Sequence, residues 1–230
     1  MKKLLTLIMA ATMAIPAFSQ YDTNRQRSRY NHNDTERYYG LRLGLNISTL
    51  NSNMADMDMG SRTGLMFGAV YGFQLANSAP LWMETGLFYS EKGGEINTPQ
   101  DVILSYGGTD KKVTVNNIKC RLSYLQVPIV CKFNIDLMDD LFLQPFLGGY
   151  LALGVGGRMK FDTKEIADRQ ANDSFDYVNR FDGGLRLGCG IEYQMVYAEA
   201  GFEFGLTNIS KSDFDRVRTQ NFFLTAGVNF

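Results

Sequence analysis

Apolar and polar residues alternate along most of the chain beyond residue 38. In the first such run, Tyr39, Leu41, Leu43, Leu45 and Ile47 alternate with small or polar residues. Successive side chains of a β-strand point to opposite sides, so this two-residue period predicts a strand with one apolar face. The period recurs in eight segments, which we expect to be strands: 38–48, 65–75, 81–92, 124–134, 141–160, 181–193, 196–206 and 221–230.

The connections between these segments alternate between long and short. Polar stretches such as 93–119 and 162–179 follow every second strand, whereas turns such as 76–80, 136–140 and 194–195 join the others. Bacterial outer-membrane barrels have short turns at one end and long loops at the other, and their strands need about 9 to 11 residues to cross the bilayer. The pattern predicts an all-β protein, an eight-stranded antiparallel up-and-down transmembrane β-barrel, with both termini on the same side.

Charged side chains decide which face of the strands looks inward. A charge near the bilayer midplane costs about 2 to 4 kcal/mol on the lipid side, whereas opposite charges can pair inside a barrel. A soluble barrel would need the reverse arrangement and would expose a very large apolar surface to water. We therefore expect a charge network in the barrel interior made of Arg42, Glu84, Lys92, Lys132, Arg186, Glu192, Glu199 and Glu203.

Glycines and aromatic residues agree with that assignment of the faces. An eight-stranded barrel is only just wide enough for side chains to fill it, which suits the many glycines on the polar face. By parity, several aromatic residues face outward near the ends of their strands, as the two aromatic belts of a membrane protein do. The predicted belts contain Tyr39, Phe73, Phe133, Tyr193 and Phe230 at one side, and Tyr89, Phe181 and Phe222 at the other.

Two prolines fit this assignment poorly. Pro128 and Pro145 lie inside the predicted strands, where proline removes one hydrogen-bond donor from the ladder of a sheet that has no edge. The strand from residue 141 also places Phe142, Phe146 and Tyr150 on its inner side. We expect a bulge or a bend in this region.

The first 37 residues have a different character. Residues 1–19 combine a positive start, an apolar core and small residues before Gln20, which is the layout of a secretory signal peptide. Residues 20–37 are polar and without periodicity, and we expect a flexible periplasmic leader before the barrel domain of residues 38–230. The formal net charge is −1 and there is no basic tract, so nothing indicates a nucleic-acid partner.

Catalytic, metal-binding and cofactor-binding chemistry is not indicated, so we expect no enzyme and no cofactor. His32 is the single histidine and lies in the leader, which excludes a histidine-based triad inside the barrel. Glu199 and Glu203 share one strand face with cations nearby, which favours a structural network over acid–base catalysis. Asp56 and Asp58 lack the fuller carboxylate spacing of a calcium loop, and three cysteines without CxxC spacing indicate no zinc site.

Several motifs resemble the PorT-like outer-membrane β-barrel family. They are YGLRLGLNISTL from Tyr39, WMETGLFYSEKGGE from Trp82, SYLQVPIVCKFNI from Ser123 and LRLGCGIEYQMVYAEAGFEFGLTNIS from Leu185. The positions that match the family pattern are Glu84, Tyr89, Ser90, Lys92, Gly93, Tyr124, Leu125, Pro128, Lys132, Gly205, Leu206, Thr207 and Asn208. The resemblance implies an outer-membrane barrel, and it implies that Pro128 belongs to the pattern. The family's namesake is associated with type IX secretion.

The expected function is a structural or binding role in the outer membrane of a Gram-negative cell. We expect a monomeric barrel in contact with outer-membrane lipid, with both termini periplasmic and protein partners at the extracellular loops or the periplasmic turns. Rigid scaffolds carry binding functions on their loops, here chiefly 94–119 and 162–179. Two alternatives remain open at the level of the sequence: an accessory component of a type IX-like secretion system, and a narrow channel.

Overall fold

The computed structural model describes residues 37–52, 60–75, 80–96, 100–106, 109–115, 118–138, 140–161, 179–210 and 217–230. The predicted signal peptide, the leader up to residue 36, His32, Asp56, Asp58 and the loop residues 162–178 lie outside the described residues.

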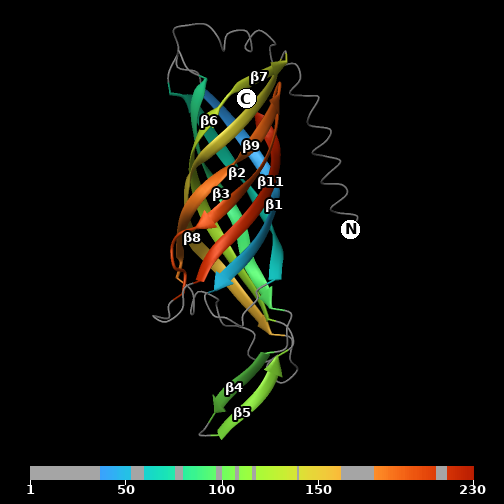
Figure 1. Cartoon of the computed structure of the whole chain (residues 1–230), viewed down its shortest axis with the longest axis vertical. Coiled ribbons are helices and arrows are strands. Elements are labelled where there is room, and N and C mark those ends of the chain that lie inside the picture. Colours follow the sequence, from blue (N-terminus) through green and yellow to red (C-terminus); the bar gives the residue numbers. More distant parts are fainter. Residues whose placement is uncertain are drawn as a thin grey trace, which may run out of the picture.

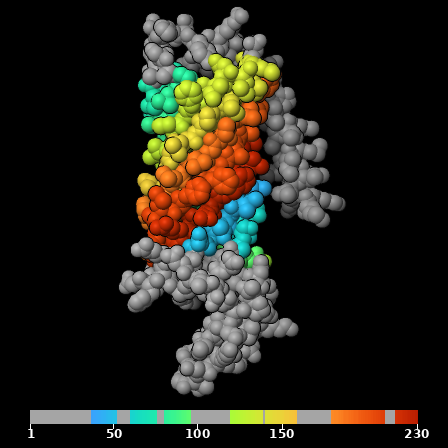
Figure 2. Space-filling view, viewed as in Figure 1, coloured from blue at the N-terminus to red at the C-terminus, as the bar shows by residue number. Residues whose placement is uncertain are grey.

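Eight long strands form one closed antiparallel barrel, as predicted. They are β1 (Arg37–Ser52), β2 (Gly60–Gln74), β3 (Leu81–Ile96), β6 (Ile118–Phe133), β8 (Leu141–Phe161), β9 (Phe181–Tyr193), β10 (Val196–Gly205) and β11 (Val217–Asn229). Each strand pairs with the next in this series, and the pairing of β11 with β1 closes the wall. Figure 1 shows the strands winding around a common axis, and Figure 2 shows the continuous oblique surface that they make.

The two ends of the barrel differ. Arg37, Phe230 and the short turns lie at one end, called the termini end here, where the backbones of Tyr39 and Phe230 exchange hydrogen bonds of 2.9 and 2.8 Å. The long connections leave from the opposite end, called the loop end. There β4 (Gln100–Tyr106) and β5 (Thr109–Val115) form a separate antiparallel hairpin that extends beyond the barrel (Figure 1).

Several strands are longer than the apolar alternation predicts. The insertion 93–119, expected to be a polar loop, contains the last residues of β3, the first of β6 and the hairpin β4–β5. The expected turn 136–140 likewise contains β7 (Ile135–Met138), which pairs with the start of β8. In the extensions of β3 and β6, outward residues such as Glu95, Lys119 and Arg121 are charged, so the apolar signal ends before the strand does.

Of the bulge or bend expected near the prolines, no bulge lies at either proline. The β3–β6 register is the same on both sides of Pro128, with Thr85 opposite Ile129 and Phe88 opposite Gln126, and the ladder only skips the pairs between them. The hydroxyl of Thr85 donates to the carbonyl of Pro128 at 2.9 Å. A bulge does occur in β8, but at Val155, ten residues beyond Pro145. Each proline therefore removes ladder hydrogen bonds without shifting the strand.

The outer face of the wall is apolar over a band of limited height. In β1 the outward side chains are apolar from Tyr39 to Ile47, and the next outward positions are Thr49 and Asn51. A nine-residue run is about 30 Å long and, at a tilt of about 40°, about 23 Å high, close to the apolar band of outer-membrane barrels. The structure therefore carries lipid-facing residues over a bilayer-sized height, with polar strand extensions beyond it at the loop end.

Candidate functional site in the barrel lumen

Polar and charged side chains fill the inside of the barrel. All eight residues of the predicted charge network point inward, and their side chains belong to residues that are 0 to 4 % exposed. They come from five different strands, β1, β3, β6, β9 and β10. Because a buried charge without a partner is very costly, the arrangement of their contacts is what allows them to lie there.

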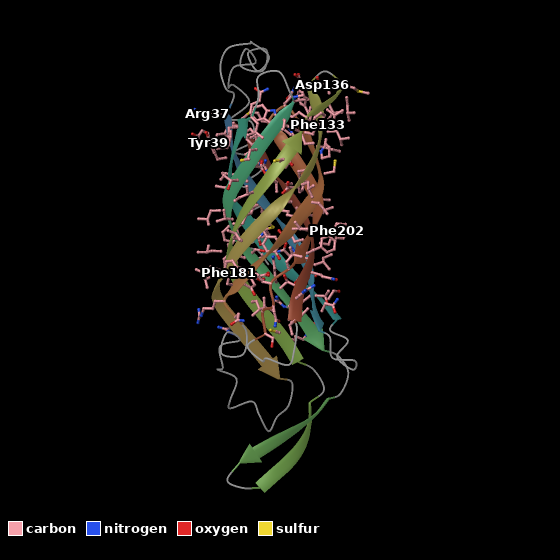
Figure 3. The ribbon with its side chains drawn as sticks, turned by 60° about the vertical axis from the view of Figure 1, so that its left-hand side comes forward. Arg37, Tyr39, Phe133, Asp136, Phe181 and Phe202 are labelled. Atoms are coloured by element: carbon pink, nitrogen blue, oxygen red, sulfur yellow. The ribbon has the colours of Figure 1, made fainter. Side chains whose placement is uncertain are left out.

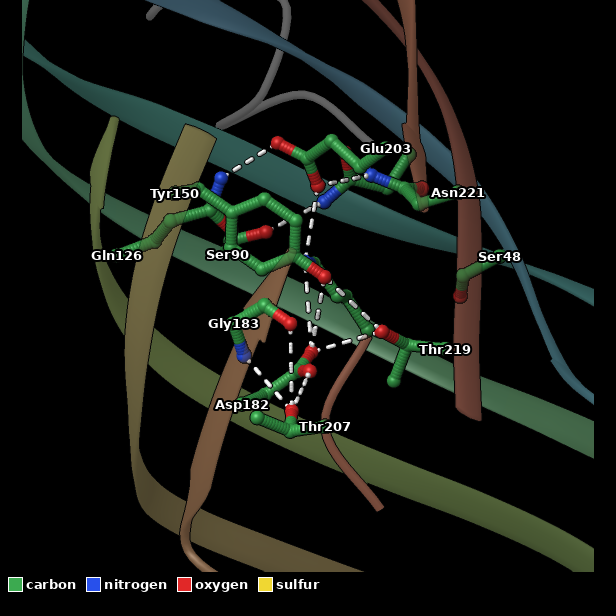
Figure 4. Close-up of polar contacts among 12 residues, drawn as sticks. Ser48, Ser90, Gln126, Tyr150, Asp182, Gly183, Glu203, Thr207, Thr219 and Asn221 are labelled. Carbon is green, nitrogen blue, oxygen red and sulfur yellow. Dashed lines mark hydrogen bonds and ion pairs between the residues drawn. The ribbon is translucent and has the colours of Figure 1, made fainter. Parts of the chain in front are cut away.

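Glu203 on β10 lies at the centre of the lumen. One carboxylate oxygen accepts hydrogen bonds from Gln126 at 2.5 Å (Figure 4) and from Arg186 at 2.6 Å. The other accepts a hydrogen bond from Asn221 at 3.0 Å, and the ammonium of Lys92 lies 2.9 Å from it. Residues from β3, β6, β9 and β11 therefore meet on one carboxylate, which ties opposite sides of the wall together.

A second group lies on the termini side of Arg186. The guanidinium of Arg186 also donates to Glu199 at 3.0 Å, which in turn accepts a hydrogen bond from Tyr197 at 3.0 Å. The ammonium of Lys132 donates to the hydroxyl of Tyr197 at 2.8 Å and to Glu84 at 2.7 Å. Hydrogen bonds and ion pairs, with Tyr197 between Lys132 and Glu199, thus connect six of the predicted residues across the lumen: Glu84, Lys92, Lys132, Arg186, Glu199 and Glu203.

Arg42 and Glu192 join the network at its edge. The guanidinium of Arg42 lies 3.6 Å from Glu84 and donates to the side-chain oxygen of Asn229 at 2.7 Å. The amide of Asn229 donates to Glu192 at 3.0 Å, and Gln144 donates to the same carboxylate oxygen at 2.8 Å. Asn229 therefore links Arg42 to Glu192, and all eight predicted residues are brought together.

Asp182 is a buried carboxylate that the predicted network omits. It accepts hydrogen bonds from Thr219 at 2.7 Å, Thr207 at 2.9 Å and Tyr150 at 3.2 Å, and the ammonium of Lys92 lies 4.0 Å away (Figure 4). Asp182 has the same parity as Arg186 in β9, so the alternation already placed it on the inner face. Because Asp182 stands at the very start of the strand, the sequence did not indicate how deeply it is buried.

Aromatic rings lie against the cations of the network on the sides that the carboxylates leave open. The guanidinium carbon of Arg186 lies 3.8 Å from the centre of the Phe223 ring, and that of Arg42 lies 4.0 Å from the Tyr197 ring. The ammonium of Lys92 is 4.1 Å from the ring of Tyr150. Desolvated cations are attracted to ring faces, so these contacts add to the ion pairs.

Glycines on neighbouring strands make room for the inward aromatic rings. Gly72 lies directly opposite Tyr38, and a Cβ atom on Gly72 would lie only 2.1 Å from the Tyr38 ring. The pairs Gly68–Phe88, Gly188–Phe146 and Gly201–Phe223 have the same directly opposite arrangement. A narrow barrel cannot hold a side chain at both positions of such a pair, which explains the glycine-rich inner face.

The chemistry of this lumen is that of paired charges. Glu199 and Glu203 both accept hydrogen bonds from the guanidinium of Arg186, so both carboxylates are engaged in contacts within the lumen. Within the described ranges, no group of three or more histidine, cysteine, aspartate and glutamate side chains has the geometry to hold a metal ion. The same ranges contain no helix that is long and apolar enough to cross a membrane.

The residues of the predicted aromatic belts lie on the outer face. Tyr39 and Phe133 are about half exposed at the termini end, and Phe181 is similarly exposed toward the loop end (Figure 3). Tyr193 and Phe230 are also about half exposed. Tyr89 and Phe222 lie well inside β3 and β11, because these strands extend past their predicted ends. They nevertheless stand where the outward side chains change from apolar to polar, and Phe73 is the last outward residue of β2.

Fold and lumen together define a class of protein, the small closed β-barrel with an apolar exterior and an interior filled by side chains. A family model described as "Outer membrane protein beta-barrel domain" matches residues 18–211 of the chain. The protein therefore belongs to this family of outer-membrane β-barrels. A comparison with the sequences of curated proteins gave no significant match.

Several solved structures are similar to this chain over most of its length. Ail, the attachment invasion locus protein of Yersinia pestis, solved in complex with the heparin analogue sucrose octasulfate, has 16% identity and a TM-score of 0.41, with 85% of this chain and 99% of that chain covered. Neisserial surface protein A has 16% identity and a TM-score of 0.40, covering 84% and 97%. OprG of Pseudomonas aeruginosa has 10% identity and a TM-score of 0.44, covering 85% and 97%.

Proposed function

We propose that this outer-membrane barrel serves as a rigid, non-conducting and non-enzymatic scaffold that binds a partner through its loop end. The observation that carries the proposal is the occupied lumen, in which Arg186 is held between Glu199 and Glu203 while Lys92 joins Glu203 to the opposite strand. The eight inner charges then have a structural role, and function falls to the parts that lie outside the wall. In this proposal the barrel is monomeric, the termini are periplasmic and the loop end is extracellular.

The hairpin β4–β5 is the part of the described loop end best placed to meet such a partner. It extends beyond the barrel, and within the described chain its strands pair only with each other (Figure 1). Binding roles concentrate on segments that a rigid scaffold holds away from its core. Removal of the hairpin therefore leaves the barrel's own pairing intact while it removes the projecting surface.

The experiment compares three strains: the parent, a knockout, and a strain whose protein has Gln100–Val115 replaced by a short glycine–serine linker. If the loop end binds the partner, cells of the linker strain attach to a surface as poorly as knockout cells do. The barrel of the linker strain still migrates faster unboiled than boiled on a denaturing gel. Attachment at the parental level in the linker strain would contradict a binding role for the hairpin.

A role in secretion is the second candidate, and it rests on the resemblance to PorT-like barrels. One observation of the structure favours it: β7 leaves Leu137 half exposed and Met138 75 % exposed at the termini end, where a periplasmic partner would dock. The same strains distinguish the two candidates. A secretion accessory leaves exported proteins in the periplasm of the knockout but not of the linker strain.

A narrow channel is the third possibility, and the occupied lumen argues against it. Purified protein inserted into a planar bilayer is expected to give no steady conductance, because no ion can pass the Arg186–Glu203–Lys92 contacts without breaking them. Stable single-channel steps would show that the lumen opens.

A further inference from the structure

The bulge in β8 determines which residues of the strand extension face outward. Tyr124 of β6 lies opposite Gly154, whereas the preceding Ser123 lies opposite Gly156, so Val155 is the extra residue. Before the bulge the odd-numbered residues of β8 point outward, and after it the even-numbered residues do. Bulges often re-aim side chains in this way. Arg158 is consequently exposed on the outer face, whereas an uninterrupted strand would direct it into the lumen.

The re-aimed arginine completes a basic array on the outer face. Arg158 lies directly opposite the exposed Arg121 of β6, and Lys119, also exposed, is the next outward residue of β6. Like charges directly opposite each other on neighbouring strands repel. A negative charge near Arg121 and Arg158 reduces this repulsion.

Among the described residues, the carboxylates that supply that charge lie on β3. Glu91 of β3 forms an ion pair with Arg121, and Glu95 lies 2.7 Å from the ammonium of Lys119. Both carboxylates belong to the strand on the far side of β6 from β8. Among the residues that the structure describes, no carboxylate forms an ion pair with Arg158, so the array has an excess of positive charge at β8.

The array lies just beyond the apolar band. The last outward apolar residues are Leu125 in β6 and Val155 in β8. Arg121 lies four residues from Leu125, and Arg158 three residues from Val155, both toward the loop end. That separation is about 10 Å along the membrane normal for a strand tilted by about 40°. The interfacial layer is about 5 to 8 Å thick on each side, and long basic side chains extend back toward it. The cations are therefore within reach of lipid headgroups.

We propose that Lys119, Arg121 and Arg158 form a binding site for the phosphate group of an anionic membrane lipid in the leaflet at the loop end. Arginine pairs with phosphate through two parallel hydrogen bonds, and an anion between Arg121 and Arg158 removes the repulsion between them. The acyl chains of the same lipid lie along the apolar band below, against Leu125 and Val155. This site goes beyond the proposed loop-end function and does not depend on it.

The test measures lipid preference by native mass spectrometry of the full chain in dodecyl maltoside micelles. Equal amounts of dioleoyl phosphatidic acid and dioleoyl phosphatidylcholine are offered together. The natural protein retains phosphatidic acid in preference, and Arg158→Gln lowers this preference about fivefold to tenfold because it removes a charge-assisted bidentate contact. Faster migration of unboiled samples on a denaturing gel checks that each variant is folded.

Two further variants separate the array from general surface charge. Arg218→Gln is the matched control, because Arg218 is also exposed at the loop end but lies opposite Asn51 instead of another cation; its preference stays at the level of the natural protein. Glu95→Gln releases Lys119 from its carboxylate and is expected to increase the preference about twofold. An increase cannot result from misfolding.

Three results would overturn the proposal. The natural protein could show no preference for phosphatidic acid over phosphatidylcholine, or Arg218→Gln could lose as much preference as Arg158→Gln. Excess inorganic phosphate could also displace the bound lipid, which would indicate a site for the free ion and not for a lipid headgroup. Retention of the lipid in that arm supports the site as proposed.

Discussion

The two faces of the barrel wall carry charges under opposite conditions. Inside, Glu203 is 1 % exposed and has four partners, among them Arg186 and Lys92. Outside, beyond the apolar band, Glu95 has a single ion pair with Lys119, and the lysine side chain is 53% exposed. The same kinds of residue therefore form a closed network on one face and an open array on the other.

Solvation accounts for this difference. A buried carboxylate loses its water, so removal of one partner leaves an uncompensated charge that costs about 3 to 5 kcal/mol. An exposed pair keeps its water and contributes about 0 to 1 kcal/mol. The cost of about 3 to 5 kcal/mol explains why each of the eight inner charged side chains has a partner. The second value means that excess charge outside, as at Arg158, costs the fold little and remains available to a ligand.

Glu203→Leu tests the inner face and should have the largest effect. The substitution leaves Arg186 and Lys92 without their shared carboxylate, so we expect the free energy of unfolding to fall by about 3 to 5 kcal/mol. Urea unfolding in lipid vesicles, followed by the loss of the faster-migrating folded band on a gel, measures the change.

The matched control is Glu95→Leu, which removes a carboxylate from the outer face. Its expected loss is about 0 to 1 kcal/mol, because the ion pair with Lys119 is solvated. Equal losses for the two variants would mean that the inner charges are not a stabilising network, and the comparison between the faces would fail.

Leu43→Arg tests the lipid-facing band. Leu43 is 64% exposed and stands midway between Tyr39 and Ile47 on the outward side of β1. An arginine near the bilayer midplane is expected to cost about 2 to 4 kcal/mol in vesicles. Ser61→Arg, on an outward position of β2 beyond the band, should cost about 0 to 1 kcal/mol. If Ser61→Arg proves the more costly of the two, the band is misplaced.

The sequence predicts the barrel well wherever lipid faces the strand. All eight strands were predicted because each carries an apolar outward run such as Leu125 to Phe133. The extensions of β3 and β6 were missed because Glu91, Glu95, Lys119 and Arg121 break that run. A strand surrounded by water on its outer side has no reason to alternate, so its pattern resembles that of a loop.

The site is predictable in its members but not in its contacts. Parity placed Glu84, Lys132 and Arg186 on the inner face, yet it could not indicate that Lys132 bonds Glu84 whereas Arg186 bonds Glu203. Those partners depend on the register between strands and on the way the wall closes. The bulge at Val155 was unpredictable for the same reason, since three of the four residues of Gly154-Val155-Gly156-Gly157 have no side chain that could fix a register.

The smallest of the expected effects concerns glycine on the two faces. Gly72→Ala places a methyl group 2.1 Å from the Tyr38 ring inside the barrel, and Tyr38 cannot move away without losing its 2.5 Å hydrogen bond to Glu84. Overpacking of this kind is expected to cost about 1 to 3 kcal/mol. Gly156→Ala is the matched control, because a Cβ there meets no atom within 4 Å on the outer face at the bulge. Its unfolding free energy should stay within about 0.5 kcal/mol of the natural protein. The glycines would then be a consequence of the filled lumen and not of strand geometry, and a similar loss for both variants would reverse that conclusion.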